Sequence, residues 1–473
     1  MIRFPRALTL FLAASLAVLS ACGGGGSSGG AASAPAAGTS ATVVSSGAIT
    51  GFGSVHLNGE HFLTTATVFN INGHSGTQGD LRVGHFITVH GHRDNAGNSV
   101  ADRIDFDDLI KGPVTSIDAT ASTLLVLGQT IVVDADTSFD DSIPGAALSG
   151  LTAGDIVEVS GTRRADGAVQ ATRIELKPAG TAFEVTGIAA SVDTATHRFN
   201  INTLVVDYTS AAVDEFTGGQ PKNGDLIEVT GTTVTAGVLI ATRIERKRTD
   251  DGAAAGDRAE AEGLVTRFVS ATDFDVAGKA VTTNASTIYV GGTAADLALN
   301  VKVEVEGSID ANGVIVASKV QLKRDGTARI AARVDSVNVA ANTLVVLGID
   351  ISVNASTRVE DKGDQRVAMF NLSNLAAGDW VEIRGAESPA GSNDVVATRL
   401  ERRKADNDVR LRGIVDSVTG TTISILGVTV ETNGSTQFDG SATLDALVGK
   451  TVSVKGTVTN GVLTVREVEF EDD

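Results

Sequence analysis

The chain has 473 residues, among them 53 Gly, 7 Pro and 1 Cys, and aromatic residues make up 4% of it. A single cysteine excludes a disulfide framework, and a formal net charge of −19 disfavours nucleic acid as a partner because it repels phosphate backbones. The hydrophobic fraction of 42% is sufficient for packed cores. This composition predicts an all-β protein of several domains, with short strands joined by turns.

The first segment, residues 1–22, has the features of a secretory signal peptide. Two arginines precede an apolar run at 7–18 that is too short to span a bilayer stably. The run ends in Leu-Ser-Ala-Cys22, which resembles the lipobox of bacterial lipoproteins. The resemblance implies lipid attachment to the thiol of Cys22 and cleavage before it. The membrane is therefore an expected partner, through the N-terminal lipid.

The next segment, residues 23–46, consists mainly of Gly, Ser and Ala. Such low-complexity composition predicts a flexible tether. The residue after Cys22 is Gly23, and the absence of Asp there favours the outer membrane. The predicted location is the bacterial cell envelope, on the periplasmic or the surface face of that membrane.

Internal repetition dominates the remaining chain. Three landmarks recur in the same order: a small residue with an alternating run, a Gly-Asp-x-Val-x-Val-x-Gly strand, and an Ala-Thr-Arg-Ile-Glu strand. Each period is long enough for a small core of its own. The predicted repeats 1 to 6 are residues 47–111, 112–180, 181–248, 261–325, 328–404 and 409–473. The segment 249–260 is predicted to be a linker that acts as a hinge. We expect the six repeats together to form a jointed rod.

Repeat 2 illustrates the expected strand layout. Its apolar and alternating runs predict strands at 114–117, 123–127, 131–133, 156–160 and 168–176. A tight turn is predicted at Gly128-Gln129. Five antiparallel strands with a break between the third and the fourth match a small OB-like barrel. The alternative is an open five-stranded sheet packed on a neighbouring repeat.

These landmarks also carry a family resemblance. The run from Gly47 to Gly59, followed by the Gly-Asp-x-Val-x-Val-x-Gly and Ala-Thr-Arg-Ile strands, resembles the tandem repeats of bacterial lipoproteins grouped as domain of unknown function 5666. The resemblance covers nearly all of residues 47–473. It implies an envelope location and a small β-barrel fold, and it implies no catalytic residue.

Six of the seven histidines lie in repeat 1. Asn58-Gly59 predicts a two-residue type I′ hairpin, which would place His56 directly opposite His61. His90 and His92 alternate along one strand and therefore share a face. Neutral imidazoles on neighbouring strands suit zinc, copper or nickel. The alternative is a solvated outer face that is rich in histidine.

Two further features favour structural interpretations. The Arg of the recurring Ala-Thr-Arg-Ile-Glu strand predicts a cross-strand salt link on the outer face of the sheet. Trp380 takes a position that an aliphatic or Phe residue fills in other repeats, which predicts packing rather than a sugar platform.

The leading functional hypothesis is a non-catalytic, lipid-anchored envelope protein whose repeats act as a spacer or as a binding and adhesive array. Its partner would be an envelope glycan or protein, and no cofactor is required. The second hypothesis is metal binding or buffering by repeat 1. The third is an enzyme acting on envelope glycans.

Overall fold

The computed structural model describes most of the repeat region. The described residues are 42–248, 252–323, 326–438, 444–459 and 461–470. Cys22 and the predicted leader lie outside the described residues, as does the tether up to residue 41. Within the described ranges, no helix combines the length and the apolar character needed to cross a membrane.

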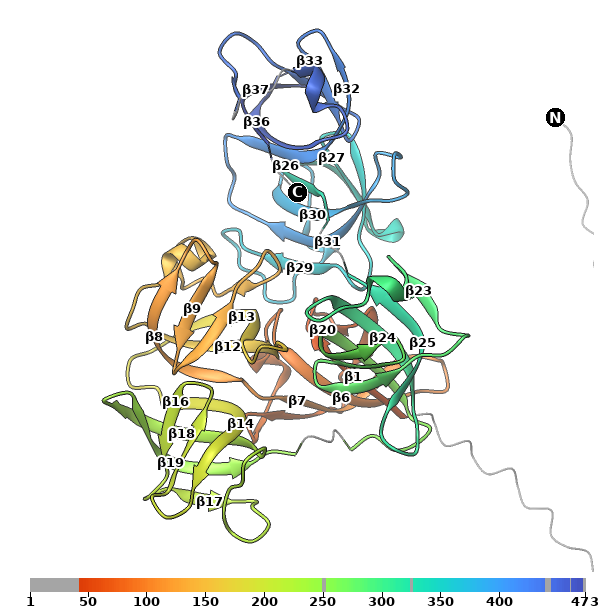
Figure 1. The fold of residues 1–473 in the computed structure, drawn as a ribbon. Helices are drawn as coiled ribbons and strands as arrows, with labels where there is room; N and C mark the ends of the chain where they lie inside the picture. The colour runs from red at the N-terminus through yellow and green to blue at the C-terminus, as the bar shows by residue number, and fades with distance from the viewer. Residues whose placement is uncertain (1–41, 249–251, 324–325, 439–443, 460, 471–473) are drawn as a thin grey trace, which may run out of the picture. The chain divides into compact units, whose positions relative to one another are not determined.

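Every repeat consists of strands, and all but repeat 3 also have short 3-10 helices among the described residues (Figure 1). Repeats 1 and 4 contain β1 (Thr42–Ala48), β2 (Val55–Leu57), β3 (Glu60–Leu63), β4 (Val68–Ile71), β5 (His74–Gly76), η1 (Gln78–Asp80), β6 (Phe86–Arg93), β7 (Ser99–Phe106), β20 (Arg258–Ser270), β21 (Asp273–Val276), β22 (Lys279–Thr282), β23 (Ile288–Val290), η4 (Ala294–Asp296), β24 (Lys302–Ile309) and β25 (Ile315–Leu322). Repeats 2 and 3 contain β8 (Ile110–Asp118), β9 (Thr123–Val126), β10 (Gln129–Val132), β11 (Ser138–Phe139), η2 (Pro144–Ala146), η3 (Leu148–Gly150), β12 (Ile156–Arg163), β13 (Val169–Lys177), β14 (Phe183–Asp193), β15 (Arg198–Ile201), β16 (Leu204–Asp207), β17 (Ala212–Asp214), β18 (Leu226–Thr235) and β19 (Val238–Arg246). Repeats 5 and 6 contain β26 (Ala328–Asn338), η5 (Val339–Ala341), β27 (Thr343–Val346), β28 (Ile349–Ser352), β29 (Arg358–Asp361), η6 (Leu372–Asn374), β30 (Trp380–Glu387), β31 (Val395–Arg402), β32 (Val409–Thr419), β33 (Thr422–Ile425), β34 (Val428–Glu431), β35 (Gln437–Phe438), η7 (Leu444–Leu447), β36 (Thr451–Thr459) and β37 (Val462–Phe470).

The predicted five-stranded barrel is confirmed. In repeat 2, β8 pairs with β9, β9 with β10, β10 with β13, β13 with β12, and β12 with β8, which closes the ring. All of these pairs are antiparallel except β10–β13, which is parallel. A ring of five strands cannot alternate direction throughout, because five is odd, so one parallel pair is required. The open-sheet alternative is thereby excluded for this repeat.

Tight turns set the register of the hairpins. Asn58 and Gly59 have φ values of 49° and 74°, which confirms the predicted type I′ turn. In repeat 2 the corresponding turn is formed by Leu127 and Gly128, with φ values of 47° and 70°. The predicted turn at Gly128-Gln129 is therefore wrong by one residue, because Gln129 belongs to β10 and is buried.

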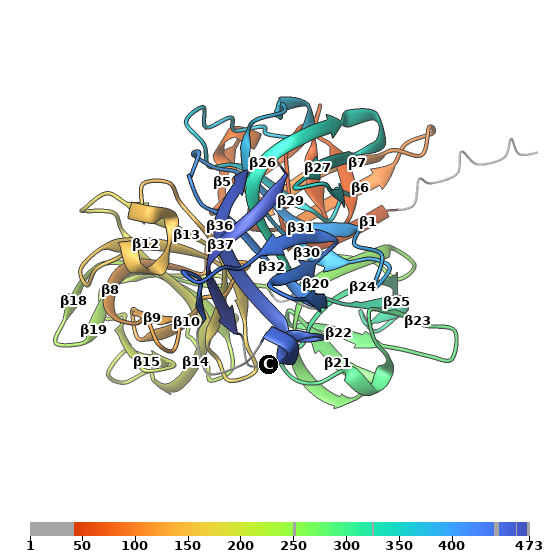
Figure 2. The same ribbon diagram turned by 90° about the horizontal axis from the view of Figure 1, so that it is seen from above.

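The last glycine of the Gly-Asp-x-Val-x-Val-x-Gly landmark is explained by a β-bulge. In repeat 2 the register of β12 against β13 shifts between Ser160 and Gly161. A Cβ atom on Gly161 would lie 2.1 Å from the carbonyl oxygen of Gln170. The strand can approach its partner this closely only when the side chain is absent. The long β36–β37 hairpin of repeat 6 has the same shift (Figure 2).

The barrels are joined in pairs through their first strands. β8 of repeat 2 pairs antiparallel with β14 of repeat 3, and β26 of repeat 5 pairs antiparallel with β32 of repeat 6. Each joint makes one 12-stranded sheet. The buried cores are also continuous across these joints, so neither repeat of a pair has a separate interior.

Repeats 1 and 4 are joined differently. β1 pairs in parallel with β20, which aligns Val43 with Arg258 and Ser45 with Glu260. The two repeats keep separate hydrophobic cores, as expected of units that bury their own interiors. Because repeats 1 and 4 are not neighbours in sequence, the prediction of a jointed rod of successive units is wrong.

Two predicted boundaries differ from the structure. β1 begins at Thr42, within the range 23–46 that was predicted as tether, and β20 begins at Arg258, within the predicted linker 249–260. The physical reason is the same in both places. These residues pair with each other across the joint, which gives each strand additional length.

Candidate functional site

The predicted histidine pair of repeat 1 is present. His56 and His61 are directly opposite each other on β2 and β3. Their rings stack with centroids 3.9 Å apart and planes inclined by 4°. Burial, followed by the charge of His61, lowers the pKa of His56 to about 4. The His56 imidazole is therefore neutral at neutral pH, which is the state that a metal ion requires.

His90 and His92 lie on β6, as predicted, but carboxylates already contact them. His90 Nε2 lies 3.3 Å from Asp105 Oδ2, and His92 Nδ1 lies 2.9 Å from Asp102 Oδ2. The structure thus brings together His56 with His61, and not the four predicted ligands. In the described part of the chain, one group of three potential ligands has all its ligand atoms within 4.8 Å, and it consists of His85, Glu158 and Glu175.

His85 takes the place of the Asp in the Gly-Asp landmark. In repeats 2, 3 and 5, Asp155, Asp225 and Asp379 each accept a hydrogen bond from the backbone N–H three residues earlier, at 2.7, 2.8 and 3.0 Å. His85 does the same with Nδ1, which accepts from the backbone N–H of Arg82 at 3.2 Å. The imidazole therefore preserves the turn, and its longer side chain also reaches a neighbouring repeat.

The far side of this imidazole links repeat 1 to repeat 2. His85 Nε2 lies 3.2 Å from Glu175 Oε1 on β13, and the ring stacks on Phe106 with centroids 4.1 Å apart. Burial lowers the pKa of His85 to about 4, although Glu175 opposes this shift. A neutral ring with Nδ1 as acceptor carries its proton on Nε2, so His85 donates to Glu175.

This donor arrangement does not fit a metal ion. A metal-ligating histidine uses an unprotonated nitrogen and donates a hydrogen bond with the other. Here the nitrogen that faces the carboxylates carries the proton. Glu175 also forms ion pairs with Arg173 Nε at 2.5 Å and Lys177 Nζ at 2.8 Å. Cations of the chain therefore already neutralise this carboxylate. The cluster is a hydrogen-bonded joint between two barrels.

Arg173 is the centre of this joint. Its Nη1 donates to the carbonyl oxygen of Val83 in repeat 1 at 3.1 Å, and its Nη2 contacts Asp140 Oδ2 at 3.1 Å. Its side chain is only 5% exposed. The salt link predicted for the recurring Arg is thus present, but in repeat 2 it is buried between barrels. The equivalent Arg243 of repeat 3 is 49% exposed and pairs with Asp214 at 2.8 Å.

A segment of repeat 2 around β11 also contacts repeat 5. Ser138 Oγ donates to Glu360 Oε2 at 3.0 Å, and Lys362 Nζ donates to the carbonyl oxygen of Phe139 at 2.9 Å. Nearby, Arg399 Nη1 donates to the carbonyl oxygen of Ala135 at 3.0 Å. Repeats 1, 2 and 5 therefore meet through buried polar side chains rather than through a shared apolar core.

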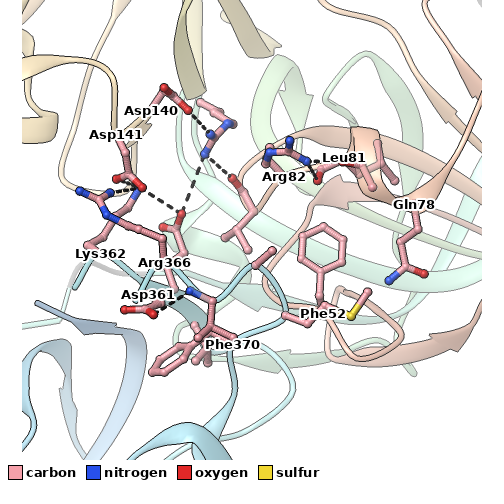
Figure 3. A pocket seen from close by; sticks show the side chains of 18 residues that line it. Phe52, Gln78, Leu81, Arg82, Asp140, Asp141, Asp361, Lys362, Arg366 and Phe370 are labelled. Carbon is pink, nitrogen blue, oxygen red and sulfur yellow. Dashed lines mark hydrogen bonds and ion pairs between the residues drawn. The ribbon is translucent and has the colours of Figure 1, made fainter. Parts of the chain in front are cut away.

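A cavity of about 210 Å³ lies where these three repeats meet, and we call it the junction cavity. Figure 3 shows Asp141, Lys362 and Arg366 on one side of it and Phe52 with Gln78 on the other. Lys362 Nζ lies 3.4 Å from Asp141 Oδ1, and Arg366 forms an ion pair with the same carboxylate. The junction cavity thus combines an ionic wall with one on which apolar side chains, Phe52 and Leu81, lie beside polar ones, Gln78 and Arg82, a lining suited to an amphipathic ligand.

Trp380 behaves as predicted. It is 7% exposed and belongs to the core shared by repeats 5 and 6, with Arg333 Cζ lying 5.8 Å from the ring centroid. The role of His85 was not predicted from the sequence. A signal was available, because Gly84-His85 occupies the place of the recurring Gly-Asp.

The repeats match one known family. Residues 43–105, 111–175, 179–245, 262–321, 332–401 and 412–469 match the model of a family described as a domain of unknown function (DUF5666). The chain belongs to the DUF5666 family. Each of the six barrels is thus one DUF5666 repeat, and the residues of the junction cavity come from three of them.

Comparisons with individual proteins add little. No match to a curated protein was found. Among solved structures, one titled "drosophila Unr CSD456" is 18% identical, and the match covers 46% of this chain and 98% of that chain with a TM-score of 0.13. At that TM-score the likeness supports no conclusion about this chain.

Proposed function

We propose that this chain is a non-catalytic, lipid-anchored protein of the bacterial cell envelope, whose barrels form a platform that binds an envelope glycan or protein. The Leu-Ser-Ala-Cys22 motif and the Gly- and Ser-rich segment after it support the anchor. Anchoring at the outer membrane rests on Gly23 at the position after the cysteine.

The observation that carries the binding role is the junction cavity, because one site is built from three repeats. Phe52 comes from repeat 1, Asp141 from repeat 2 and Arg366 from repeat 5. Residues so distant in sequence stay together only if the barrels are held in place, and buried contacts such as Ser138 with Glu360 do this. A platform of this kind favours binding over a role as a spacer.

The anchor is tested with the full chain in a bacterial host. We expect the wild type to incorporate labelled palmitate and to sediment with membranes, and the Cys22→Ser variant to do neither. Ser33→Ala in the same low-complexity segment is the matched control and should behave as the wild type. Absence of label from the wild-type chain would contradict the proposal.

The binding role is tested with residues 40–473, which form a compact unit of their own. Immobilised wild-type unit should retain an envelope component that Ala368→Trp does not, because this exposed residue lines the junction cavity and a bulky ring would fill it. Ala195→Trp, at an exposed turn of repeat 3, is the control and should retain the component. Equal retention by all three proteins would argue against the cavity as the site.

A second candidate function, metal capture in repeat 1, is favoured by the stacked pair of His56 and His61. Titration of residues 40–473 with zinc, copper and nickel should then show saturable binding tighter than about 10 μM. His61→Asn should weaken that binding, whereas His197→Asn in repeat 3 should not. Equal affinity of the His61→Asn variant and the wild type would exclude the pair as ligands.

A further inference from the structure

A second cavity of about 520 Å³ adjoins the junction cavity and shares Asp141, Lys362 and Arg366 with it. It extends between the loop after β11 in repeat 2 and the strands of repeats 5 and 6. Basic side chains dominate its lining, and we call it the basic groove. These side chains are Arg329, Lys362, Arg366, Arg403, Lys404 and Arg410.

The charge of the basic groove is opposite to that of the chain. Six basic side chains line it against four acidic ones, Asp141, Glu382, Asp406 and Asp408. The chain as a whole has a formal net charge of −19. A local excess of positive charge on so acidic a protein attracts anions to this place.

Three of the four acids contact more than one cation. Asp141 contacts Lys362 and Arg366, and Asp408 contacts Arg466 and, at 3.8 Å, Lys455. Asp408 receives both terminal nitrogens of Arg466 at 2.6 Å, and Arg466 does not line the groove. Glu382 contacts Arg329 at 2.7 Å and Arg403 at 3.1 Å. Although burial opposes it, these guanidinium groups hold the pKa of Glu382 below its usual range. Glu382 is thus neutralised by cations of the groove itself, whereas Asp408 is neutralised by Arg466 from outside it, so the lining keeps its excess of positive charge.

Two cations of the basic groove, Lys404 and Arg410, pair with exposed carboxylates. Lys404 Nζ lies 3.0 Å from Asp364 Oδ1, with side chains 66% and 81% exposed. Arg410 Nη2 lies 3.8 Å from Asp406 Oδ2, with side chains 44% and 47% exposed. Exposed ion pairs of this kind contribute little to the stability of the fold. An anionic ligand can therefore replace the carboxylates as the partner of these cations.

We propose that the basic groove binds an acidic saccharide, that is, a sugar chain bearing carboxylate or phosphate groups. Guanidinium groups such as that of Arg410 match the geometry of carboxylates and phosphates. The carboxylates of Asp406 and Asp408 accept hydrogen bonds from sugar hydroxyls. A volume of about 520 Å³ lies within the usual range for ligand sites. The inference rests on the proposed envelope function, because an envelope glycan is one of the two partners proposed there.

Isothermal titration of residues 40–473 tests this site. The probes are a trimer of galacturonic acid, mannose 6-phosphate, the neutral trisaccharide maltotriose, and triglutamate as an acidic peptide. We expect saturable binding of at least one acidic sugar and none of maltotriose. The two acidic probes distinguish a carboxylate from a phosphate as the recognised group. Raising the salt from about 50 to about 500 mM should weaken the binding severalfold, because screening acts on exposed charges.

The variants locate the site. Lys404→Gln combined with Arg410→Gln should weaken binding at least about tenfold without lowering the thermal unfolding midpoint. The control combines Arg198→Gln with Arg267→Gln, exposed and ion-paired arginines of repeats 3 and 4, and should bind as the wild type.

Four results would overturn the proposal: no saturable binding of either acidic sugar, equal binding of maltotriose, tighter binding of triglutamate, or equal losses in the two double variants. This titration does not involve Cys22, so its failure is distinguishable from failure of the lipid anchor.

Discussion

The three pairs of barrels are joined in two different ways. In the pair formed by repeats 5 and 6, Ile330 on β26 aligns with Leu411 on β32, and both side chains are fully buried in one continuous core. In the pair formed by repeats 1 and 4, Ser45 on β1 aligns with Glu260 on β20, and both are buried between two separate cores. The central buried pair is apolar at the first joint, where Arg329–Arg412 and Ala331–Arg410 flank it, and polar at the second. We call the first the apolar joint and the second the polar joint.

The same kind of barrel edge therefore supports two kinds of assembly. Pairing of backbone groups is common to both joints, since it requires only an open edge of the first strand. The side chains then decide whether the partners share an interior. At the polar joint, burial raises the pKa of Glu260 to about 7 although Arg258 opposes it. At the apolar joint the buried pair of Ile330 and Leu411 contains no titratable group, and the arginines of this joint lie in the flanking pairs.

The largest effect is expected from truncating the apolar joint. Leu411→Ala should lower the free energy of unfolding by about 2–5 kcal/mol and raise hydrogen exchange in both β26 and β32, because repeats 5 and 6 share one core. Phe274→Ala is the matched change in repeat 4, where Phe274 is fully buried in a core of its own. It should raise exchange in repeat 4 and leave β4 and β7 of repeat 1 protected. Faster hydrogen exchange in repeat 1 of the Phe274→Ala variant would contradict the proposed difference between the two joints.

A pH-dependent effect is expected at the polar joint. The pKa of Glu260 is raised from 4.5 to about 7 on folding, so its contribution to stability is complete below pH 4.5 and is lost as pH rises to 7. Glu260→Gln cannot ionise, so at pH 8 it should be more stable than the wild type, by on the order of 3 kcal/mol at most.

Urea unfolding at pH 5 and pH 8 measures this difference. Glu306→Gln on the neighbouring β24, whose side chain is 26% exposed, is the control and should not reproduce the gain at pH 8. A Glu260→Gln variant whose stability fell at pH 8 would show that Glu260 is ionised at the joint and favourable there.

A smaller effect is expected from Ser45→Ala. Ser45 Oγ donates to Glu260 Oε2 at 3.1 Å and accepts from Asn58 Nδ2 at 2.9 Å. Removing it leaves both buried partners short of one hydrogen bond, which costs about 1–3 kcal/mol. Because Ser45 donates to the carboxylate, the loss should be greater at pH 8 than at pH 5. A loss independent of pH would mean that this hydrogen bond does not depend on the charge of Glu260.

The fold of one repeat could be predicted because its signals are local. Asn58-Gly59 specified a type I′ hairpin, and the alternation around Val157 and Val159 specified a strand with these two side chains in the core. The other face of that strand, with Glu158 and Ser160, is buried as well, which the alternation did not indicate. The parallel pair β10–β13 could also have been inferred, since five strands cannot close a ring by alternation alone. The turn at Leu127-Gly128 was misplaced because Leu is an unexpected residue at a positive φ.

The joints and the candidate site could not be predicted in the same way. β1 and β20 pair through backbone groups, which every sequence possesses, so the sequence contains no signal for their partnership. Arg173 and Arg243 occupy the same place in their repeats, yet one is buried between barrels and the other is exposed. Their environments depend on which barrels meet, and this information is absent from a single repeat.

The most direct test measures hydrogen exchange of β1 in residues 40–473 and in a chain that ends at residue 248, which lacks repeats 4 to 6. We expect the β1 amides that face β20 to lose protection in the shorter chain, whereas β14, whose partner β8 is retained, keeps its protection. Unchanged protection of β1 in the shorter chain would contradict the pairing of repeats 1 and 4.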